Sequence, residues 1–382
     1  MLVSKSRQNI KEVEMKKIPC CIVRGGTSKG IFFNGCDLPV DKSHLDNFLL
    51  DVMGSPDAKQ IDGLGGANSL TSKVAIVSKS KMDGVDVDYT FAQVSITDQK
   101  VDVKGNCGNI SSAVGLFAIN QGLVSVEDGN VTVSIYNTNT KKVIYSSMLV
   151  KDGTVVEEGD VQISGVPGKA AAVNVSFSNP QGAVTGKLLP TGNATDHIET
   201  SFGSFDISII DAANPLVYMR AEDLELTGLE LPQQFDEILL GKIEEVRSIA
   251  AQMCGFSTKE NATKESPAVP KATIISSPKD YVDSNGVQHS KNDYDISVRM
   301  MSMQKPHNAL AITGAVCTAV ASRVEGSLVN AIVKNTNTNI LIAHPGGVMS
   351  SSYTEKDDVV LVSVVRTARM IMSGFVFTKK EY

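Results

Sequence analysis

Short runs of apolar and β-branched residues, separated by Gly, Asn and Asp, follow one another along most of the chain. Such runs are typical of strands joined by turns. They span residues 31–33, 73–77, 85–91, 131–136, 143–150, 172–177, 272–276, 295–299 and 359–365. Helical spacing of apolar positions occurs in residues 42–53, 109–120, 233–253 and 308–323. The pattern predicts a β-rich protein of the α+β class.

Two of the predicted helices, residues 109–120 and 308–323, carry small and apolar side chains nearly all round, whereas residues 233–253 carry Glu and Lys on one face. We therefore expect the two apolar helices to be buried. Each follows a strand that ends in a polar turn, and after each a glycine is followed within two residues by Leu-Val. This weak internal duplication predicts two pseudo-symmetric domains, each a curved, mostly antiparallel sheet wrapped around a central helix.

The segment of residues 177–197 is rich in Gly, Pro, Asn and Thr and is the expected crossover between the domains. We place the N-terminal domain in residues 16–188 and the C-terminal domain in residues 189–382, and leave open a return of the last strand or helix to the first domain. Residues 1–15 precede the patterned sequence and are expected to form a tail. Residues 257–271 are expected to form a surface loop.

The composition excludes several classes of function. The 382 residues include 36 Lys and Arg against 42 Asp and Glu, a formal net charge of −6, with no long basic run, so nucleic acid is not an expected partner. The 6 Cys form no Cys-x-x-Cys pair and the 5 His add no zinc-ligand spacing, so we expect neither a metal site nor a disulfide scaffold. The sequence shows no signal peptide and no apolar run of about 18 residues, which predicts a cytoplasmic protein without a membrane partner.

Cys107 lies in residues 105–109 (GNCGN), directly before the first apolar helix. Thiols close to a helix N-terminus are more acidic than free cysteines, so such a side chain is able to act as a base or an acid near neutral pH. The alternative is a small core cysteine, which is the common fate of an isolated Cys. The flanking Gly and Asn residues favour a site, because a core position rarely needs them.

Lys73 ends a loop rich in Gly, Asn, Ser and Thr, residues 62–72, and begins an apolar strand. Loop residues of these types offer backbone N–H groups and hydroxyls to a ligand. A lysine at the edge of a core has a lowered pKa and exchanges protons more readily. The alternative is an outward-pointing strand lysine, which the sequence alone favours.

Residues 24–30 (RGGTSKG) suit a carboxylate, through Arg24, the Thr27 and Ser28 hydroxyls and the glycine amides. The segment also matches Gly-x-Ser-x-Gly, but a nucleophile elbow needs a helix after the serine, and a second strand is predicted there. Residues 63–68 lack the third glycine of a dinucleotide-binding loop, and no Gly-Lys-Ser/Thr phosphate loop is present. We therefore expect no cofactor.

His307 precedes the second apolar helix, at the place that Cys107 has before the first. It is predicted either to cap the helix or satisfy the core, or to bind a ligand or move a proton. Residues 344–347 (HPGG) predict a turn with a structural role. If both apolar helices begin at a cleft between the domains, their free N–H groups and positive dipole ends favour a ligand with two or more carboxylates.

Several segments together resemble the family of 2-methylaconitate cis-trans isomerases, 3-methylitaconate Δ-isomerases and 4-oxalomesaconate tautomerases. The resemblance runs from about residue 18 to residue 374 and is carried by residues 24–30, 59–73, 94–96, 105–109, 190–193 and 344–347. It implies the diaminopimelate epimerase-like fold and cofactor-independent proton transfer in a cleft between the domains. It also implies that the catalytic pair is Lys73 and Cys107.

The epimerases of this fold use two cysteines, whereas the second half of this chain has His307 and no cysteine at the related helix start. Asn214 with Pro215 resembles an Asn-Pro ligand turn of those epimerases. The groups expected to orient substrate carboxylates are Arg24, Thr27, Ser28, Gly66, Asn68, Ser69, Ser72, Asn106, Gly108, Asn109, Asn214 and His307.

The resulting hypothesis is a cofactor-independent isomerase that moves a C=C bond in a methyl-substituted unsaturated di- or tricarboxylate. The substrate would be 3-methylitaconate, converted to 2,3-dimethylmaleate, or 2-methylaconitate in its cis and trans forms. The alternatives are a 4-oxalomesaconate tautomerase, a cysteine-dependent epimerase and a non-enzymatic accessory protein of an iron–sulfur hydratase. The partner is a small polycarboxylate, and a homo-oligomer is left open.

Overall fold

The computed structural model describes residues 17–333, 338–379 and 382, so the predicted tail, residues 1–15, lies outside the described residues. The strands are β1 (Lys17–Gly25), β2 (Ser28–Asn34), β3 (Lys73–Lys79), β4 (Val87–Val94), β5 (Val101–Asp102), β6 (Gly129–Asn137), β7 (Lys142–Lys151), β8 (Thr154–Val155), β9 (Val173–Ser178), β10 (Asp196–Thr200), β11 (Gly203–Ala212), β12 (Asn214–Arg220), β13 (Lys271–Ser276), β14 (Tyr281–Val282), β15 (Gln288–His289), β16 (Ile296–Ser302), β17 (Lys305–Pro306), β18 (Asn339–His344), β19 (Gly347–Lys356), β20 (Val359–Arg366) and β21 (Ala368–Phe377). The α-helices are α1 (Lys42–Met53), α2 (Gly108–Ser111), α3 (Val114–Asn120), α4 (Glu237–Met253), α5 (Ala262–Glu265), α6 (Ile312–Ala321) and α7 (Leu328–Ile332).

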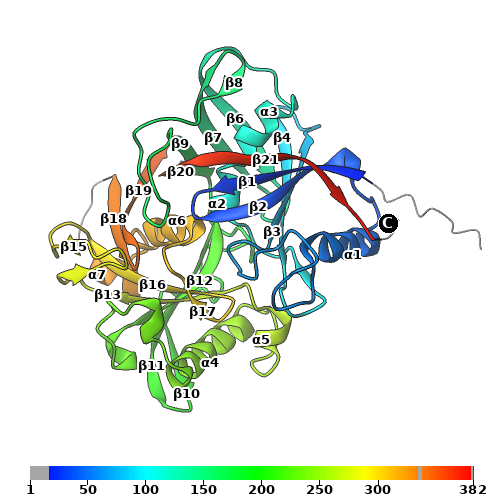
Figure 1. The fold of residues 1–382 in the computed structure, drawn as a ribbon. Coiled ribbons are helices and arrows are strands. Elements are labelled where there is room, and N and C mark those ends of the chain that lie inside the picture. The colour runs from blue at the N-terminus through cyan, green and yellow to red at the C-terminus, as the bar shows by residue number, and fades with distance from the viewer. Residues whose placement is uncertain (1–16, 334–337, 380–381) are drawn as a thin grey trace, which may run out of the picture.

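One mixed sheet runs through the molecule (Figure 1). It joins 19 of the described strands, and β14 and β15 form a separate pair. Most neighbouring strands are antiparallel, and β2–β3, β4–β6, β12–β13 and β16–β18 are parallel. The α+β class and the mostly antiparallel sheet are therefore confirmed.

The chain's last strands lie beside its first ones. β21 pairs along the whole of β1, and β20 lies between β9 and β19. Figure 1 shows these last strands, in red, crossing the N-terminal half next to the blue β1. Strands from the two ends of the chain therefore lie in the same part of the sheet.

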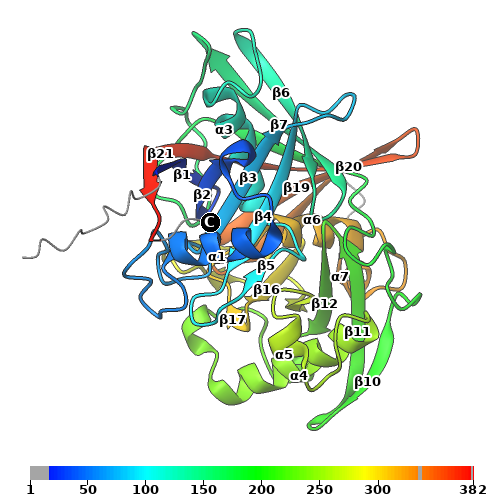
Figure 2. The ribbon, with the colours of Figure 1, turned by 90° about the vertical axis from the view of Figure 1, so that its right-hand side faces the viewer.

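Each half of the sheet packs against an inner and an outer helix. In the N-terminal half, α3 contributes Phe117 to the central core, and α1 contributes Phe48 to a second cluster on the other side. In the C-terminal half, α6 contributes Val316 to the central core, and α4 contributes Val246 to a third cluster. Figures 1 and 2 show α3 and α4 toward opposite ends of the molecule. This arrangement agrees with the predicted internal duplication.

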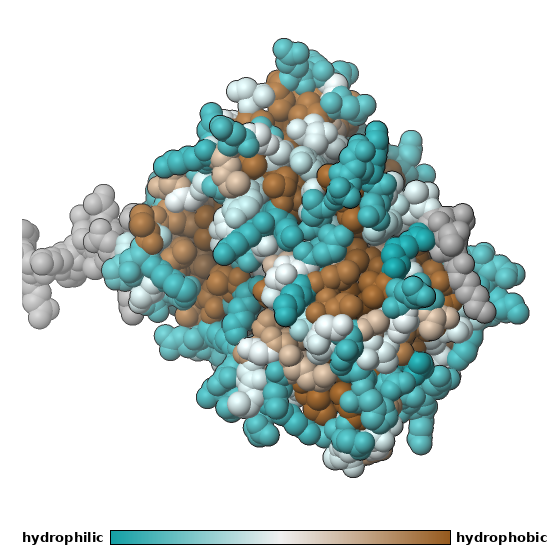
Figure 3. Space-filling model, turned by 180° about the vertical axis from the view of Figure 1, so that it is seen from behind, coloured by the Kyte–Doolittle hydropathy of each residue, from teal (hydrophilic) through white to brown (hydrophobic). Residues whose placement is uncertain are grey.

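The molecular surface is mixed. On the face opposite to that of Figure 1, apolar residues gather in separate patches between hydrophilic ones (Figure 3). None of the helices within the described ranges is both long and apolar enough to cross a membrane.

Two predicted helices differ from what the structure shows. The segment 109–120 is divided into α2 and α3, because the Ala113 N–H bonds to the carbonyl of Ile110, three residues back rather than four. The segment 308–323 becomes helical only at Ile312, because Ala311 is still extended with φ −66° and ψ 143°. The predicted surface loop 257–271 contains the short helix α5.

Candidate active site

Lys73 and Cys107 line the same small cavity, of about 40 Å³, where the two halves of the chain meet. Lys73 is the first residue of β3, and Cys107 is the residue that caps the start of α2. The other lining residues are Ser28, Leu70, Phe91, Gln93, Asp102, Gly105, Asn106, Asn109, Asn214, Ala268, Lys271, Ser302, Met303, His307, Ala311 and Thr313. The lining thus combines residues from strands and loops of both halves.

Lys73 is held in the wall of this cavity with 5 % of its surface exposed. Its Nζ donates to the Oε1 of Gln93 at 2.6 Å and lies 5.2 Å from the centre of the Phe91 ring. Burial lowers the pKa of Lys73, and the charge of Cys107 and a hydrogen bond that the ammonium donates to its sulfur act in the opposite direction. A lysine with a lowered pKa has more of the neutral amine that proton transfer needs.

Gln93 fixes the direction of the Lys73 amine. Its Nε2 donates to the carbonyls of Ser72 at 2.9 Å and Ser69 at 3.2 Å, which leaves its oxygen facing Lys73. Ser72 itself points away from the cavity, because its Oγ donates to the carbonyl of Val94 at 2.9 Å and accepts from Gln60 at 2.8 Å. Ser72 therefore supports the loop rather than lining the site.

Cys107 is half-buried at the start of α2, at the place where α2 contacts α6. A Cβ built on Gly108 would lie 2.6 Å from the Cβ of Ile312, the first residue of α6. Asn106 is fixed by a hydrogen bond from the Ser111 hydroxyl at 3.1 Å. The absence of a side chain at Gly108 thus lets the second half approach Cys107 closely.

Lys271, at the start of β13, is a cavity residue that the sequence analysis missed. Its Nζ donates to the carbonyl of Ala268 at 3.2 Å. Burial and the nearby Lys73 lower the pKa of Lys271 to about 8, against the charges of Cys107 and Asp102. The signal was the same as for Lys73, a lysine between a polar loop and an apolar strand. At neutral pH this group supplies a positive charge to the cavity.

His307 faces the same cavity, 6 % exposed. Its Nδ1 accepts a hydrogen bond from the backbone N–H of Ala309 at 3.0 Å, so the neutral ring carries its proton on Nε2. Burial, Lys271 and Lys73 lower the pKa of His307 to about 4. The expectation that His307 opens the second inner helix is wrong, because Ala311 has that place. His307 is a neutral hydrogen-bond donor beside the site.

Several buried polar atoms of the cavity have no hydrogen-bond partner in the described part of the chain. They are the Oγ of Ser28, the Oδ2 of Asp102 and the Oδ1 atoms of Asn109 and Asn214. Buried polar atoms are normally hydrogen-bonded, so such a group in one cavity is typical of a binding site. Ser28, Asn106, Asn109, Asn214 and His307 are thus brought together with Lys73 and Cys107, as the sequence analysis expected.

Other expected site residues lie elsewhere. The guanidinium of Arg24 donates to the carbonyl of Gly26 at 3.1 Å and to Thr367 at 3.0 Å, and it does not line the cavity. Thr27 accepts a hydrogen bond from Asn109 at 3.0 Å and lines a different cavity. Gly66 packs against Thr71. The carboxylate role of Arg24 stays a prediction, and the lysines that line the cavity are Lys73 and Lys271.

A larger cavity, of about 1040 Å³, adjoins the small one and shares Gln93, Asp102 and His307 with it. Asn68 and Ser69 line this larger cavity. It has the volume of a ligand pocket, whereas the small cavity has room for little more than water. The large cavity thus borders the one that Lys73 and Cys107 line.

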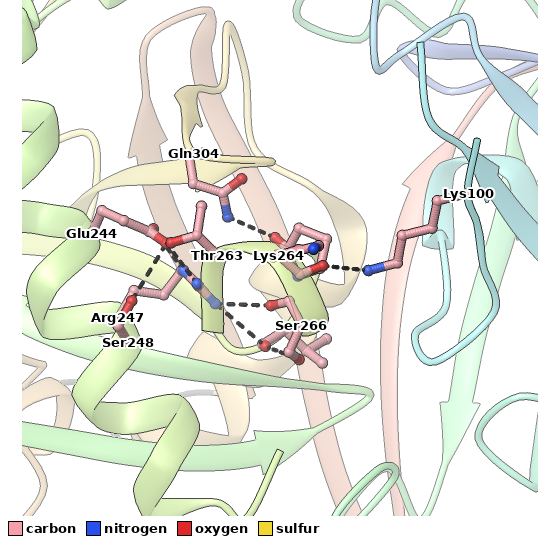
Figure 4. A network of polar contacts seen from close by, with 10 residues as sticks. Lys100, Glu244, Arg247, Ser248, Thr263, Lys264, Ser266 and Gln304 are labelled. Carbon is pink, nitrogen blue, oxygen red and sulfur yellow. Dashed lines mark hydrogen bonds and ion pairs between the residues drawn. The ribbon is translucent and has the colours of Figure 1, made fainter. Parts of the chain in front are cut away.

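The α5 loop (residues 257–270) forms part of the rim of the large cavity and is tied to the other half of the chain (Figure 4). Lys100 donates to the carbonyl of Lys264 at 2.6 Å, as Figure 4 shows. Lys104 donates to the carbonyl of Glu265 at 2.9 Å. From the opposite side, Arg247 pairs with Glu244 at 2.6 Å and donates to the carbonyl of Ser266 at 2.9 Å. The α5 loop is thus held in place by lysine and arginine side chains that donate hydrogen bonds to its backbone carbonyls.

Within the residues described, no group of three or more His, Cys, Asp or Glu side chains is placed to hold a metal ion. The hydrogen-bond donors that line the cavity are instead amines, amides, hydroxyls, one imidazole and one thiol, beside the carboxylate of Asp102. This donor set suits an anionic organic substrate, because it offers hydrogen bonds and positive charge to carboxylates.

The family model described as "PrpF protein" matches residues 15–379. The chain is 51% identical over 368 residues to the "Putative isomerase YraM" of Bacillus subtilis, covering 96% of this chain and 99% of that protein. It is 45% identical over 374 residues to the "3-methylitaconate isomerase" of Eubacterium barkeri, covering 96% and 98%.

Solved structures agree with these similarities. The crystal structure of a methylitaconate-delta-isomerase matches with a TM-score of 0.80 and 44% identity, covering 96% of each chain. The structure of a hydroxyproline epimerase from Agrobacterium vitis matches with a TM-score of 0.57 at 11% identity, covering 96% of this chain and 93% of that chain. The second match shows a shared fold, and the expected epimerase-like architecture is confirmed.

Proposed function

Because the chain belongs to the PrpF protein family and is an isomerase, we propose that it moves a C=C bond within a methyl-substituted unsaturated di- or tricarboxylate. The observation that carries this proposal is the placement of Lys73 and Cys107 in one cavity with several unpaired polar atoms. The preferred substrate is 3-methylitaconate, because relatives named for it share 45% and 44% identity with this chain.

The reaction needs one base and one acid. A base removes the allylic proton, the electron pair of that C–H bond moves into a dienolate, and an acid returns a proton to the far carbon. No atom is gained or lost. Lys73 and Cys107 divide these two transfers, since each is able to hold and release a proton and both face the cavity. Gln93 keeps the Lys73 amine in a fixed direction for this step.

The dienolate places negative charge on a substrate carboxylate. Lys271 supplies a positive charge beside that group, and the Ser28 hydroxyl supplies a donor that no other described residue occupies, whereas the unpartnered Oδ1 atoms of Asn109 and Asn214 are acceptors for a substrate proton or N–H group. Groups fixed before the reaction stabilise developing charge without reorganising, which lowers the barrier. The neutral His307 adds an N–H donor at the edge of the cavity.

A cysteine-dependent epimerase is disfavoured by the second half of the site. Such an enzyme needs a second thiol facing Cys107, and the matching position at the start of α6 is Ala311. Cys317 lies further along α6, fully buried, and its thiol donates to the carbonyl of Ile210 at 3.3 Å. A non-enzymatic accessory protein is disfavoured because binding alone needs neither Lys73 nor Cys107.

Proton NMR in deuterated buffer tests the proposal. The wild-type protein should convert 3-methylitaconate to 2,3-dimethylmaleate with incorporation of solvent deuterium. Cys107→Ala and Lys73→Ala should each reduce the rate by at least about a hundredfold, the usual size of a lost acid or base. The matched controls are Cys36→Ala and Lys81→Ala, which change exposed residues outside the cavity. Near-wild-type conversion by either site variant would contradict this division of roles.

A further inference from the structure

Arg366, the last residue of β20, is buried with 5 % of its surface exposed. Its Nη1 donates to the carbonyl of Val365 at 2.7 Å, its Nη2 meets only the weakly accepting sulfur of Met349, and its Nε has no partner among the described residues. No ion pair to Arg366 is found in the described ranges, and burial lowers its pKa to about 9. A buried cation without a counter-charge is costly, so this position favours an anion.

His344 contributes a second donor close to Arg366. It is fully buried, and its Nδ1 accepts a hydrogen bond from the backbone N–H of Gly346 at 3.1 Å. The ring proton is therefore on Nε2, which is buried and has no partner within the described part of the chain. Burial and the charge of Arg366 lower the pKa of His344 well below its usual value, so the ring stays neutral and remains a donor.

Both residues line a cavity of about 360 Å³ that shares no lining residue with the catalytic cavity. Its walls come from β9, β18, β19, β20 and residues 161–164. Among the described residues the lining contains no Asp or Glu, and Arg366 is its one basic residue apart from the neutral His344. Asn174, Ser350 and Ser352 add neutral polar groups. The cavity is therefore electrostatically suited to a single small anion.

We propose that Arg366 and His344 form a second binding site, separate from the catalytic cavity, for a small organic anion bearing a carboxylate. A carboxylate matches the planar donor fork of an arginine better than a round anion does. The 360 Å³ volume is at the lower end of the range for small-molecule sites. The residues of the HPGG turn, 344–347, thereby acquire a role besides closing a hairpin.

The proposed site adjoins the catalytic one. Thr27 lines the Arg366 cavity, and its Oγ1 accepts a hydrogen bond from the Nδ2 of Asn109, which lines the catalytic cavity. One hydrogen bond, between Asn109 and Thr27, thus links a residue that lines one cavity to a residue that lines the other. The test must consequently distinguish the two sites.

Isothermal titration calorimetry with malonate makes this distinction. Wild-type protein should bind two malonate ions per chain, one in the Arg366 cavity and one where the catalytic cavity adjoins the large cavity. Arg366→Met should lose one of them, and Lys271→Met should weaken the other while retaining the Arg366 site. A wild-type stoichiometry of one that Lys271→Met abolishes and Arg366→Met leaves unchanged would overturn the proposal, as would no binding at millimolar malonate.

Thermal unfolding measurements and a second variant, His344→Phe, distinguish loss of malonate binding from loss of folding. Without malonate, Arg366→Met should melt at or above the wild-type temperature, because an unpaired buried charge is removed. Malonate should raise the melting temperature of Lys271→Met and not that of a protein carrying both changes. Should Arg366→Met not fold, His344→Phe removes the N–H at similar volume and should weaken this site by about tenfold; unchanged affinity would refute the site. Sulfate competing as well as malonate would refute the carboxylate preference.

Discussion

Gly108 and Ile312, the first residues of α2 and α6, touch so closely that a Cβ on Gly108 would lie 2.6 Å from the Cβ of Ile312. The next-nearest atoms are the Cγ2 of Ile312 at 2.8 Å and the backbone nitrogen of Thr313 at 3.2 Å. Cys107 immediately precedes Gly108. The distance between the Cys107 thiol and the second half of the chain therefore depends on the absence of a side chain at position 108.

Gly108→Ala should impair catalysis more than folding. The added methyl must displace α6 from α2, and a displacement of about 1 Å in a catalytic site costs on the order of a hundredfold in rate. Overpacking should also destabilise the protein by about 1–3 kcal/mol. Steady-state kinetics and thermal unfolding measure the two effects.

Gly241→Ala is the matched control for this change. Gly241 lies in α4, and a Cβ there would meet nothing within 4 Å. Alanine in a helix is favoured over glycine by about 1 kcal/mol, so this variant should be fully active and slightly more stable. Full activity of Gly108→Ala would show that the contact between the two helices does not position the thiol.

The lowered pKa of Lys271 predicts that activity is lost at alkaline pH. Its pKa is lowered to about 8, and the positive form is the one that attracts a carboxylate, so kcat/KM should fall as pH rises through about 8. Lys271→Arg keeps its charge throughout this range, because an arginine pKa is above about 12. In that variant the alkaline fall should move to higher pH, and a fall that stays near pH 8 would assign it to another group.

The hydrogen bond between Gln93 and Lys73 predicts that a change at Gln93 shifts the pKa of Lys73. A carboxylate in place of the Gln93 amide, 2.6 Å from the Lys73 Nζ, favours the charged ammonium. Gln93→Glu should therefore move the limb of the pH profile that Lys73 controls upward by about 1–3 pH units. Gln288→Glu adds the same charge at an exposed position and should leave the profile unchanged. If the pH profile of Gln93→Glu matched that of the wild type, the titration of Lys73 would not control the rate.

The lysines that hold the α5 loop predict an effect on substrate binding. The double variant Lys100→Met, Lys104→Met removes the charged donors from the carbonyls of Lys264 and Glu265. We expect a KM raised by about fivefold to tenfold, since each such hydrogen bond contributes about 1 kcal/mol, with little change in global stability.

Limited digestion with a protease that cuts after glutamate provides a second readout for the same variant. Cleavage after Glu260 and Glu265 should become faster when the loop is released, because local opening exposes the backbone. Lys81→Met, an exposed residue outside this loop, serves as the control. Unchanged KM and unchanged cleavage together would show that the two lysines do not hold the rim.

The parts of the fold that depend on local signals could be predicted from the sequence. α1 spans Lys42–Met53 as expected, because Asp41 caps its start through the N–H groups of Ser43 and His44, and Gly54 ends it in a left-handed conformation. The predicted strands are also present, since alternating apolar residues need only a neighbouring strand to form.

The site was less predictable where it depends on distant pairings. The pairing of β13 with β12 and β16 places Lys271 near Lys73. The residues around Lys271 in the sequence do not indicate this pairing. Arg24 turns away because β1 pairs with β21, which places Thr367 next to its guanidinium. The helix start was misplaced at His307 because Ala309, Leu310 and Ala311 have high helical propensity, yet α6 begins only at Ile312.

The pairing of β1 with β21 and of β9 with β20 also bears on how the chain is made. During synthesis, the N-terminal half leaves the ribosome with two strand edges that only the last part of the chain can cover. Contacts between residues so far apart in the sequence form slowly. A chain truncated before β20 would contain every described residue that lines the cavity of Lys73 and Cys107 and would still retain exposed strand edges that favour aggregation.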